Sequence, residues 1–161
     1  HCKNVGIDFI STPFDDEAVD FLEPIVPYYK IASADITNIP FLRKIASKRK
    51  PVVLSTGASS LAEIDTAVQV LELSGCSQIA LLHCILNYPT DDVNANLSMI
   101  TGLKNTYPNR VVGYSDHTIG IATPIAAIAM GAKIIEKHIT LSRKLKIDSS
   151  SSLLGLGNTF K

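Results

Sequence analysis

Short continuous apolar runs alternate along the chain with stretches in which apolar residues recur every three or four positions. The runs are rich in Val, Ile and Leu and have no polar face, which is typical of strands covered by helices on both sides of a parallel sheet. Six runs are expected to be strands: residues 5–11, 28–32, 51–55, 79–84, 110–115 and 133–139.

Helix signals fill the intervals between these runs. Ser60 followed by Glu63 is a capping-box pattern, and Gly75 supplies the stop after the apolar repeat that begins at Leu61. Further helices are expected after residues 15–16, 37–38 and 96, and over residues 121–130. Each of these starts behind a residue that commonly caps helices or carries an apolar repeat at helical spacing.

This alternation predicts an α/β fold, either part of a (β/α)8 barrel or an open doubly wound sheet. No GxGxxG or GxxxxGK[ST] sequence follows the first run, which weighs against a nucleotide-binding open sheet. A full barrel takes about 250 residues, so about six βα units make a partial (β/α)8 TIM barrel. We expect residues 1–145 to form this domain and residues 146–161, with four consecutive serines, to be an aberrant or disordered tail.

Composition narrows the class of protein. The 161 residues include 15 Lys and Arg against 15 Asp and Glu, and this zero net charge argues against a nucleic-acid or membrane-surface partner. No apolar run reaches the roughly 18 residues of a membrane helix. The three cysteines are an odd number without a CxxC pair, which favours a reducing, cytoplasmic setting.

Polar residues follow most of the predicted strands, where both architectures place their active sites. A single Ser, Thr or Asp there is more often a helix cap. Three of the four histidines, however, lie at strand ends. Alternation puts Ser115 and His117 on one face of their strand and Glu136 and His138 on one face of the next. If the strands are neighbours, two imidazoles beside a carboxylate suit a divalent metal ion.

Lys30 lies on an otherwise apolar strand. A lysine pointing into a barrel is costly unless it is paired with an anion. A phosphate would satisfy it, helped by the hydroxyls of Thr12, Ser33 and Ser55. The alternative is a lysine at the sheet edge whose ammonium group reaches solvent.

The stretches FISTPFDDEAVDFLE, YYKIASADITNIPFLRKIA, PVVLSTGASSLAEI, LLHCILNYPT, VVGYSDHTIG and IIEKHITL follow one another in the chain. In them the chain resembles the sialic acid synthases, a family that includes N-acetylneuraminate, legionaminate and pseudaminate synthases. The resemblance implies a (β/α)8 barrel that condenses phosphoenolpyruvate with N-acetylmannosamine or a related diacetamido-hexose and releases phosphate. It also implies a divalent metal cofactor, Mn²⁺ or Mg²⁺, and the homodimer formed by full-length relatives.

The resemblance assigns roles to the candidate residues. His117 and His138 would bind the metal, while Lys30 and Glu136 would be catalytic, with Glu136 on the sugar side. The residues expected to bind substrate are Thr12, Ser33, Ser55 and Ser115 for phosphoenolpyruvate, and Asp35, Asn87 and Tyr88 for the sugar.

The sequence departs from the family pattern in ways that leave alternatives open. Asn87 directly precedes Tyr88, whereas neuraminate-type enzymes place the asparagine two positions before the tyrosine. Asp35 stands where many of them have glutamate, so legionaminate-type chemistry is a plausible reading. The family's first two strands and its small C-terminal domain are expected to be absent. One alternative is therefore an inactive fragment that only binds a ligand or a partner chain; another is a different phosphoenolpyruvate-using or class II-like aldolase barrel.

Overall fold

The computed structural model describes residues 1–139. Contacts within the chain divide it into two compact units, His1–Leu81 and Leu82–Lys161, which we call the N-terminal and C-terminal units. The boundary falls inside strand β3 (Ile79–Cys84). The predicted tail at residues 146–161 lies outside the described residues, and the domain boundary at residue 145 stays a prediction.

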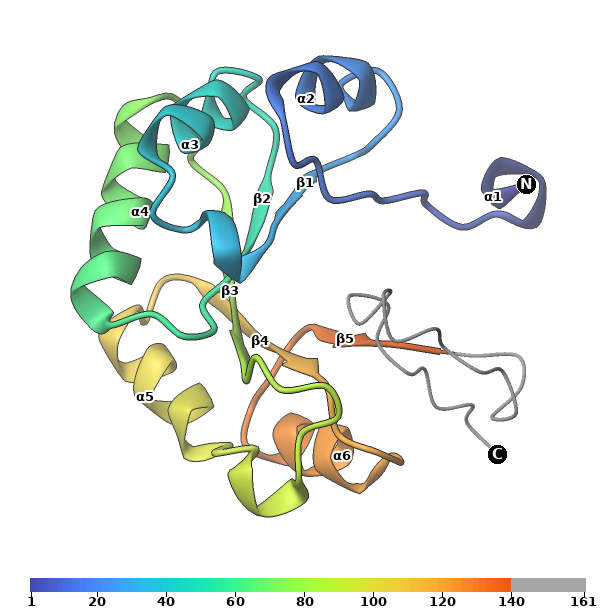
Figure 1. Ribbon diagram of the computed structural model, residues 1–161, viewed down its shortest axis with the longest axis vertical. Coiled ribbons are helices and arrows are strands. Elements are labelled where there is room, and N and C mark those ends of the chain that lie inside the picture. The colour runs from blue at the N-terminus through green and yellow to red at the C-terminus, as the bar shows by residue number, and fades with distance from the viewer. Residues whose placement is uncertain (140–161) are drawn as a thin grey trace. The chain divides into compact units, whose positions relative to one another are not determined.

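The N-terminal unit alternates helices with parallel strands. β1 and β2 pair in parallel, with Lys30 opposite Val53. Helices α3 and α4 lie side by side in this unit, as Figure 1 shows in cyan and green. The elements of the unit before β3 are α1 (Cys2–Val5), α2 (Asp16–Leu22), β1 (Tyr29–Ile31), the 3-10 helix η1 (Ser33–Asp35), α3 (Ile39–Ala46), β2 (Val52–Ser55) and α4 (Leu61–Leu73).

Side-chain caps begin three of these helices. The Asp15 carboxylate caps α2 and the Asn38 amide oxygen caps α3, each accepting a backbone N–H from the first turn. At α4, Ser60 and Glu63 form the complete reciprocal capping box that the sequence predicts. The helix starts are therefore local properties of the chain, and they confirm the predictions made for these segments.

The core of the N-terminal unit lies between the strands and the helices. The Tyr29 hydroxyl is buried and donates a 2.7 Å hydrogen bond to the backbone oxygen of Val19, which satisfies the polar end of a core side chain. The other large side chains that are fully buried in this unit are Val19, Ile31, Leu42, Ile45, Leu54, Leu71 and Leu81.

The strand predicted at residues 5–11 is wrong. Cys2–Val5 is a short helix that ends at Gly6 with φ of 73°. The residues after it belong to no strand, and the side chains of Ile7 and Phe9 are 60% and 45% exposed. A strand forms only where a neighbouring strand satisfies its backbone donors and acceptors. Within residues 1–139 no strand pairs with this segment, so its apolar pattern alone does not make it one.

The C-terminal unit continues the alternation. β4 and β5 pair in parallel, and their register places Ser115 opposite Glu136 and Asp116 opposite Lys137. Helices α5 and α6 both pack against β4 (Figure 1). The elements after β3 are the 3-10 helix η2 (Asp92–Asn94), α5 (Ser98–Thr106), β4 (Val111–Asp116), α6 (Ala122–Ala129) and β5 (Ile135–Lys137).

Gly113 permits a close approach between neighbouring segments of this unit. A β-carbon at this position would lie 2.6 Å from both the backbone oxygen of Ile134 and a methyl carbon of Leu82. No side chain fits at such distances without a shift of its neighbours, and here one neighbour is backbone. Glycine in the middle of β4 is thus what lets the segment before β5 lie against it.

The strand order decides between the two predicted architectures. Hydrogen-bonded neighbours follow chain order, β1-β2-β3-β4-β5, with helices between the strands. An open doubly wound sheet reverses its strand order at a switch point, whereas a (β/α)8 barrel does not. The prediction of a partial (β/α)8 barrel is confirmed, with five of the six predicted strands present in residues 1–139. No helix in those residues is both long and apolar enough to span a bilayer.

Candidate functional site

A buried cation lies at the strand ends of the N-terminal unit. Lys30, in the middle of β1, is only 8% exposed, and its Nζ donates a 2.8 Å hydrogen bond to Oγ of Ser55, the last residue of β2. Beside them, the Ser33 hydroxyl oxygen accepts the backbone N–H of Gly57 at 2.9 Å. We call Lys30, Ser33, Ser55 and the Gly57 backbone the lysine–serine cluster.

The lysine–serine cluster has the composition of an anion site. An ammonium group and two hydroxyls at strand ends, in a buried setting, favour a phosphate or a carboxylate. The alternative of a lysine that reaches solvent at the sheet edge is wrong, because the Lys30 side chain turns inward to Ser55. Thr12 lies half-buried before α2 and takes no part in these hydrogen bonds.

Asp35 closes η1 in the same unit. Its Oδ2 atom is buried and has no hydrogen-bond partner among residues 1–139. Buried acceptors of this kind are rare in folded proteins and often mark a place where a ligand or water donates. This leaves the Asp35 carboxylate available to a hydroxyl or amide donor.

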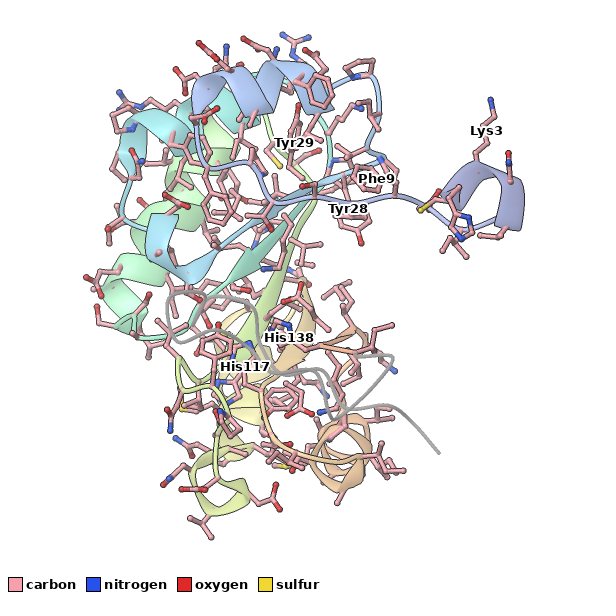
Figure 2. All side chains as sticks on the ribbon, turned by 45° about the vertical axis from the view of Figure 1, so that its right-hand side comes forward. Lys3, Phe9, Tyr28, Tyr29, His117 and His138 are labelled. Carbon is pink, nitrogen blue, oxygen red and sulfur yellow. The ribbon has the colours of Figure 1, made fainter. Side chains whose placement is uncertain are left out.

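Three aromatic rings gather at the strand ends of the C-terminal unit. The ring centres of Tyr88 and His117 are 4.0 Å apart, those of His117 and His138 are 5.4 Å apart, and Tyr88 meets His138 edge-on at 5.8 Å. Figure 2 shows the two histidines near one another. We call Tyr88, His117 and His138 the histidine–tyrosine cluster.

A hydrogen bond to the backbone sets the tautomer of His117. Its Nδ1 lies 2.6 Å from the backbone oxygen of Ile85. A carbonyl oxygen cannot donate, so Nδ1 carries the proton and the neutral ring keeps the lone pair on Nε2. Burial, the largest effect, lowers the pKa of His117 below its usual value; the hydrogen bond to Ile85 partly opposes this, and the nearby His138 lowers the pKa further. Neutral imidazole with a free Nε2 is the form that binds metals.

Ser115 and Glu136 complete the surroundings of His117. The Ser115 hydroxyl donates a 2.6 Å hydrogen bond to Oε1 of Glu136, and its oxygen lies 3.5 Å from Nε2 of His117. Because the hydroxyl proton points at Glu136, the Ser115 oxygen and the His117 nitrogen present lone pairs to each other. An electron-rich pair beside a carboxylate fits a cation.

The two histidines are compatible with one divalent ion. An ion about 2.1 Å from a ring nitrogen lies roughly 3 Å from the ring centre, so two ligand rings stand at most about 6 Å apart. The 5.4 Å between the centres of His117 and His138 lies inside this limit. Residues 1–139 hold no group of three or more His, Cys, Asp and Glu side chains that could bind a metal. The protein ligands that the described residues offer are thus the two imidazoles, with open positions left for water or substrate.

Asn87 and Tyr88 differ in how they are placed. Tyr88 covers the His117 ring, and burial raises the pKa of its phenol. The Asn87 side chain is exposed, and only its backbone oxygen is engaged, accepting the Thr90 hydroxyl at 2.6 Å. The structure therefore brings Tyr88 into the cluster, while the role of the Asn87 side chain stays a prediction.

The sequence analysis missed a buried ion pair behind this cluster. The Lys137 ammonium contacts Oδ2 of Asp116 and donates to the backbone oxygen of Thr118 at 2.9 Å. The other Asp116 oxygen accepts the Thr118 backbone N–H at 2.9 Å. The sequence did contain a signal for this pair: Asp116 in SDHT and Lys137 in EKH carry opposite charges, and each directly precedes a histidine.

A parallel sheet whose strands follow chain order, with polar residues at the strand ends, defines the class of (β/α)8 barrel proteins. The chain belongs to the NeuB family, whose family model matches residues 1–155. It is 45% identical over 148 residues to the N,N'-diacetyllegionaminic acid synthase of Campylobacter jejuni, and 38% identical over 147 residues to the N-acetylneuraminate-9-phosphate synthase of Drosophila melanogaster. It also resembles the crystal structure of the N-acetylneuraminic acid synthetase of Leptospira borgpetersenii, with a TM-score of 0.83 and 44% identity.

These matches cover most of this chain and less than half of each relative. The Campylobacter and Drosophila proteins are matched over 90% and 91% of this chain but only 44% and 40% of their own length. The Leptospira structure is matched over 88% of this chain and 49% of its own. The family and the barrel fold are established, and the activity of a whole protein is a separate question.

Proposed function

We propose that this chain supplies strand-end residues for a nonulosonate synthase, an enzyme that condenses phosphoenolpyruvate with an amino sugar and releases phosphate. The observation that carries the proposal is the pair of dissimilar clusters at strand ends of a NeuB-family chain. One is a buried lysine with serine hydroxyls, and the other is a pair of imidazoles beside a carboxylate.

The lysine–serine cluster would bind phosphoenolpyruvate. Lys30 balances the negative charge of the phosphate or carboxylate, and Ser33 and Ser55 orient its oxygens. Such groups are held in place before the substrate arrives, and a positive charge in a buried site is worth several kcal/mol, on the order of 3 or more, to a transition state in which negative charge develops. Thr12 and Ser115 remain predicted contacts for the same substrate.

The histidine–tyrosine cluster would hold a divalent metal, Mn²⁺ or Mg²⁺, through His117 and His138. When bound, such an ion acts as a Lewis acid toward a carbonyl oxygen. The chain's own part is to fix the tautomer of His117 through the Ile85 oxygen, so that Nε2 faces the ion, and to cover the ring with Tyr88. Glu136, which accepts a hydrogen bond from the Ser115 hydroxyl, would accept another from a hydroxyl of the sugar.

The overall reaction balances without an oxidant or reductant. The electrons of the C2–C3 double bond of phosphoenolpyruvate form a bond to the aldehyde carbon of the sugar, and the aldehyde oxygen takes up a proton. Water adds at C2 and gives up its two protons, one in place of the proton taken up by the aldehyde oxygen and one to the departing phosphate. Phosphate leaves C2 with the electrons of the broken C–O bond, so that C2 becomes a ketone. Lys30 offsets the charge that grows on the departing phosphate. The free thiols of the described residues accord with a reaction in the cytoplasm, which we propose as its setting.

We propose a 2,4-diacetamido sugar as the acceptor. Asp35 is one methylene shorter than the glutamate of many neuraminate-type enzymes, and its buried Oδ2 lacks a partner, which suits an acetamido N–H. Asn87 directly precedes Tyr88, one position away from the asparagine of the neuraminate pattern, which also favours a different sugar. Asn87 and Tyr88 remain predicted contacts of that sugar.

Phosphate release tests the proposal. The protein is incubated with phosphoenolpyruvate and Mn²⁺, with N-acetylmannosamine or the 2,4-diacetamido sugar added in turn. Release that depends on the diacetamido sugar is the expected result. Release only with N-acetylmannosamine overturns the sugar assignment. Folded protein that binds phosphoenolpyruvate and releases nothing with either sugar identifies the alternative, a binding fragment.

A further inference from the structure

The strands that carry the candidate metal ligands also carry a buried ion pair. Asp116 is the last residue of β4 and Lys137 the last of β5, and the parallel register places them opposite each other. Their side chains are 0% and 5% exposed. Neither residue belongs to the histidine–tyrosine cluster, and neither has a role in the function proposed above.

A buried pair of this kind is seldom explained by stability. Removing two charges from water is costly, and well-packed apolar residues often stabilise a protein as well or better. The best-attested use of buried polar contacts is to select one register among several. Here the Lys137 ammonium contacts both the Asp116 carboxylate and the Thr118 backbone oxygen, so two points at the end of β4 are tied to one atom of β5.

Alternation connects this pair to the candidate site. Along a strand, successive side chains point to opposite faces. Asp116 therefore lies behind Ser115 and His117, and Lys137 lies behind Glu136 and His138. A slip of one residue between β4 and β5 would turn one strand's ligand away from the other's, because it exchanges the two faces.

We propose that Lys137, through its pairing with Asp116, is a positioning residue for the metal site. The pair fixes the register of the two strand ends, so that the rings of His117 and His138 face one ion. Asp116 also holds the backbone on the far side of His117 by accepting the Thr118 N–H. The inference rests on the proposed function in so far as it concerns a metal, while the ring placement itself does not depend on one.

Two double variants separate positioning from mere stability. Asp116→Leu with Lys137→Met fills the space with apolar groups and removes the ties, whereas Asp116→Asn with Lys137→Gln keeps neutral hydrogen-bonding groups. Single variants leave a buried charge and are expected to unfold. Lys48→Met is the matched control, because it also removes a lysine from ion pairs, those with Asp20 and Glu23, but in the other unit.

Each variant is measured in two ways after thermal unfolding has shown that it folds. Mn²⁺ alone is titrated and followed by the spin-resonance signal of the free ion. Independently, the protein carries labelled histidine, and the cross-relaxation between the rings of His117 and His138 is recorded without metal. The control is expected to match the native protein in both.

The apolar pair is expected to fold, to bind Mn²⁺ about 10- to 100-fold more weakly and to lose the ring-to-ring signal, while the amide pair retains much of both. The proposal is overturned if the apolar pair keeps the ring-to-ring signal, or if the native protein lacks it. Native protein that binds no Mn²⁺ refutes the proposed metal site, and the ring signal then decides the positioning role by itself.

Discussion

The two units build their strand-end clusters from opposite chemistry. In the N-terminal unit the central group is an ammonium, Lys30, surrounded by hydroxyls and a backbone N–H. In the C-terminal unit the central groups are two imidazoles, with the Glu136 carboxylate nearby; burial lowers the pKa of His117, whose Nε2 presents a lone pair. The first arrangement attracts anions and the second attracts cations.

The difference shows how little of a site's chemistry the architecture specifies. β1 with β2 and β4 with β5 are both parallel pairs joined through a helix. Active residues collect at the carboxyl ends of such strands because the loops there are free to vary. Which charge a strand end attracts then depends on a few side chains, so the two clusters should fail independently when those side chains are changed.

The largest expected effect concerns the cation side. His138→Ala removes one of two imidazole ligands, and we expect Mn²⁺ affinity to fall by more than about 100-fold, since outer contacts alone are worth 10- to 100-fold. His117→Ala should do the same, and sugar-dependent phosphate release should be lost with either. Mn²⁺ titration checks this, with Lys30→Ala as the control. Unchanged binding in both histidine variants contradicts the ligand assignment.

Lys30→Ala tests the anion side. Hydrogen bonds to charged groups contribute about 1.5–3 kcal/mol, so binding of phosphoenolpyruvate should weaken by roughly 10- to 100-fold. Mn²⁺ affinity should stay at its native value, because the imidazoles lie in the other unit. Calorimetric titration with each ligand measures both. A variant whose KM and kcat for phosphoenolpyruvate are unaltered removes Lys30 from the site.

Gly113 tests the packing behind the cation cluster. Gly113→Ala introduces a β-carbon 2.6 Å from a backbone oxygen, and we expect a loss of about 1–3 kcal/mol in the free energy of unfolding. Gly102→Ala is the matched control in α5, where nothing lies within 4 Å of the new carbon. That change should stabilise by up to about 1 kcal/mol. Denaturant unfolding that ranks the two alike would contradict the close approach.

The smallest effect is a gradual dependence on pH. His83 is buried, which lowers its pKa below the 6.5 of an ordinary histidine, although its bond to the Ala95 oxygen partly opposes this. The unfolded chain then binds the proton more readily, so stability is full above pH 6.5 and falls as the pH drops below it. His83→Phe, which keeps a ring beside Tyr114, should have a shallower slope in denaturant unfolding between pH 7.5 and 5.5, a range of about two units around the usual value.

Much of the fold could be predicted because its signals are local. The capping box at Ser60 and Glu63 joins residues three apart, and the buried face of α3 repeats at helical spacing. Five strands could be predicted because their apolar runs are continuous and have no alternating polar residues that would indicate a solvent-exposed face. Residues 5–11 carry the same kind of run and form no strand, because a strand needs a partner and the run does not say whether one is present.

The candidate site could be predicted in part for the same reason. Alternation put Ser115 with His117 and Glu136 with His138, and the structure joins these pairs by a hydrogen bond and a ring contact. The residues of the loop after β3 could not be placed in this way, because the backbone of a loop has no fixed period. Only the structure shows that Tyr88 contacts the His117 ring, and the role that the resemblance assigned to Asn87 stays a prediction.

By itself, the sequence determined the types of most elements, the helix caps and the residues that stand at the ends of the five strands. Only the tertiary structure decided that Lys30 turns to Ser55, that His117 carries its proton on Nδ1, and that Lys137 pairs with Asp116. Periodicity and capping depend on residues within one turn or one strand. Partners that lie 21 to 32 positions apart meet only when the strands have taken their register, so their chemistry is a property of the folded chain.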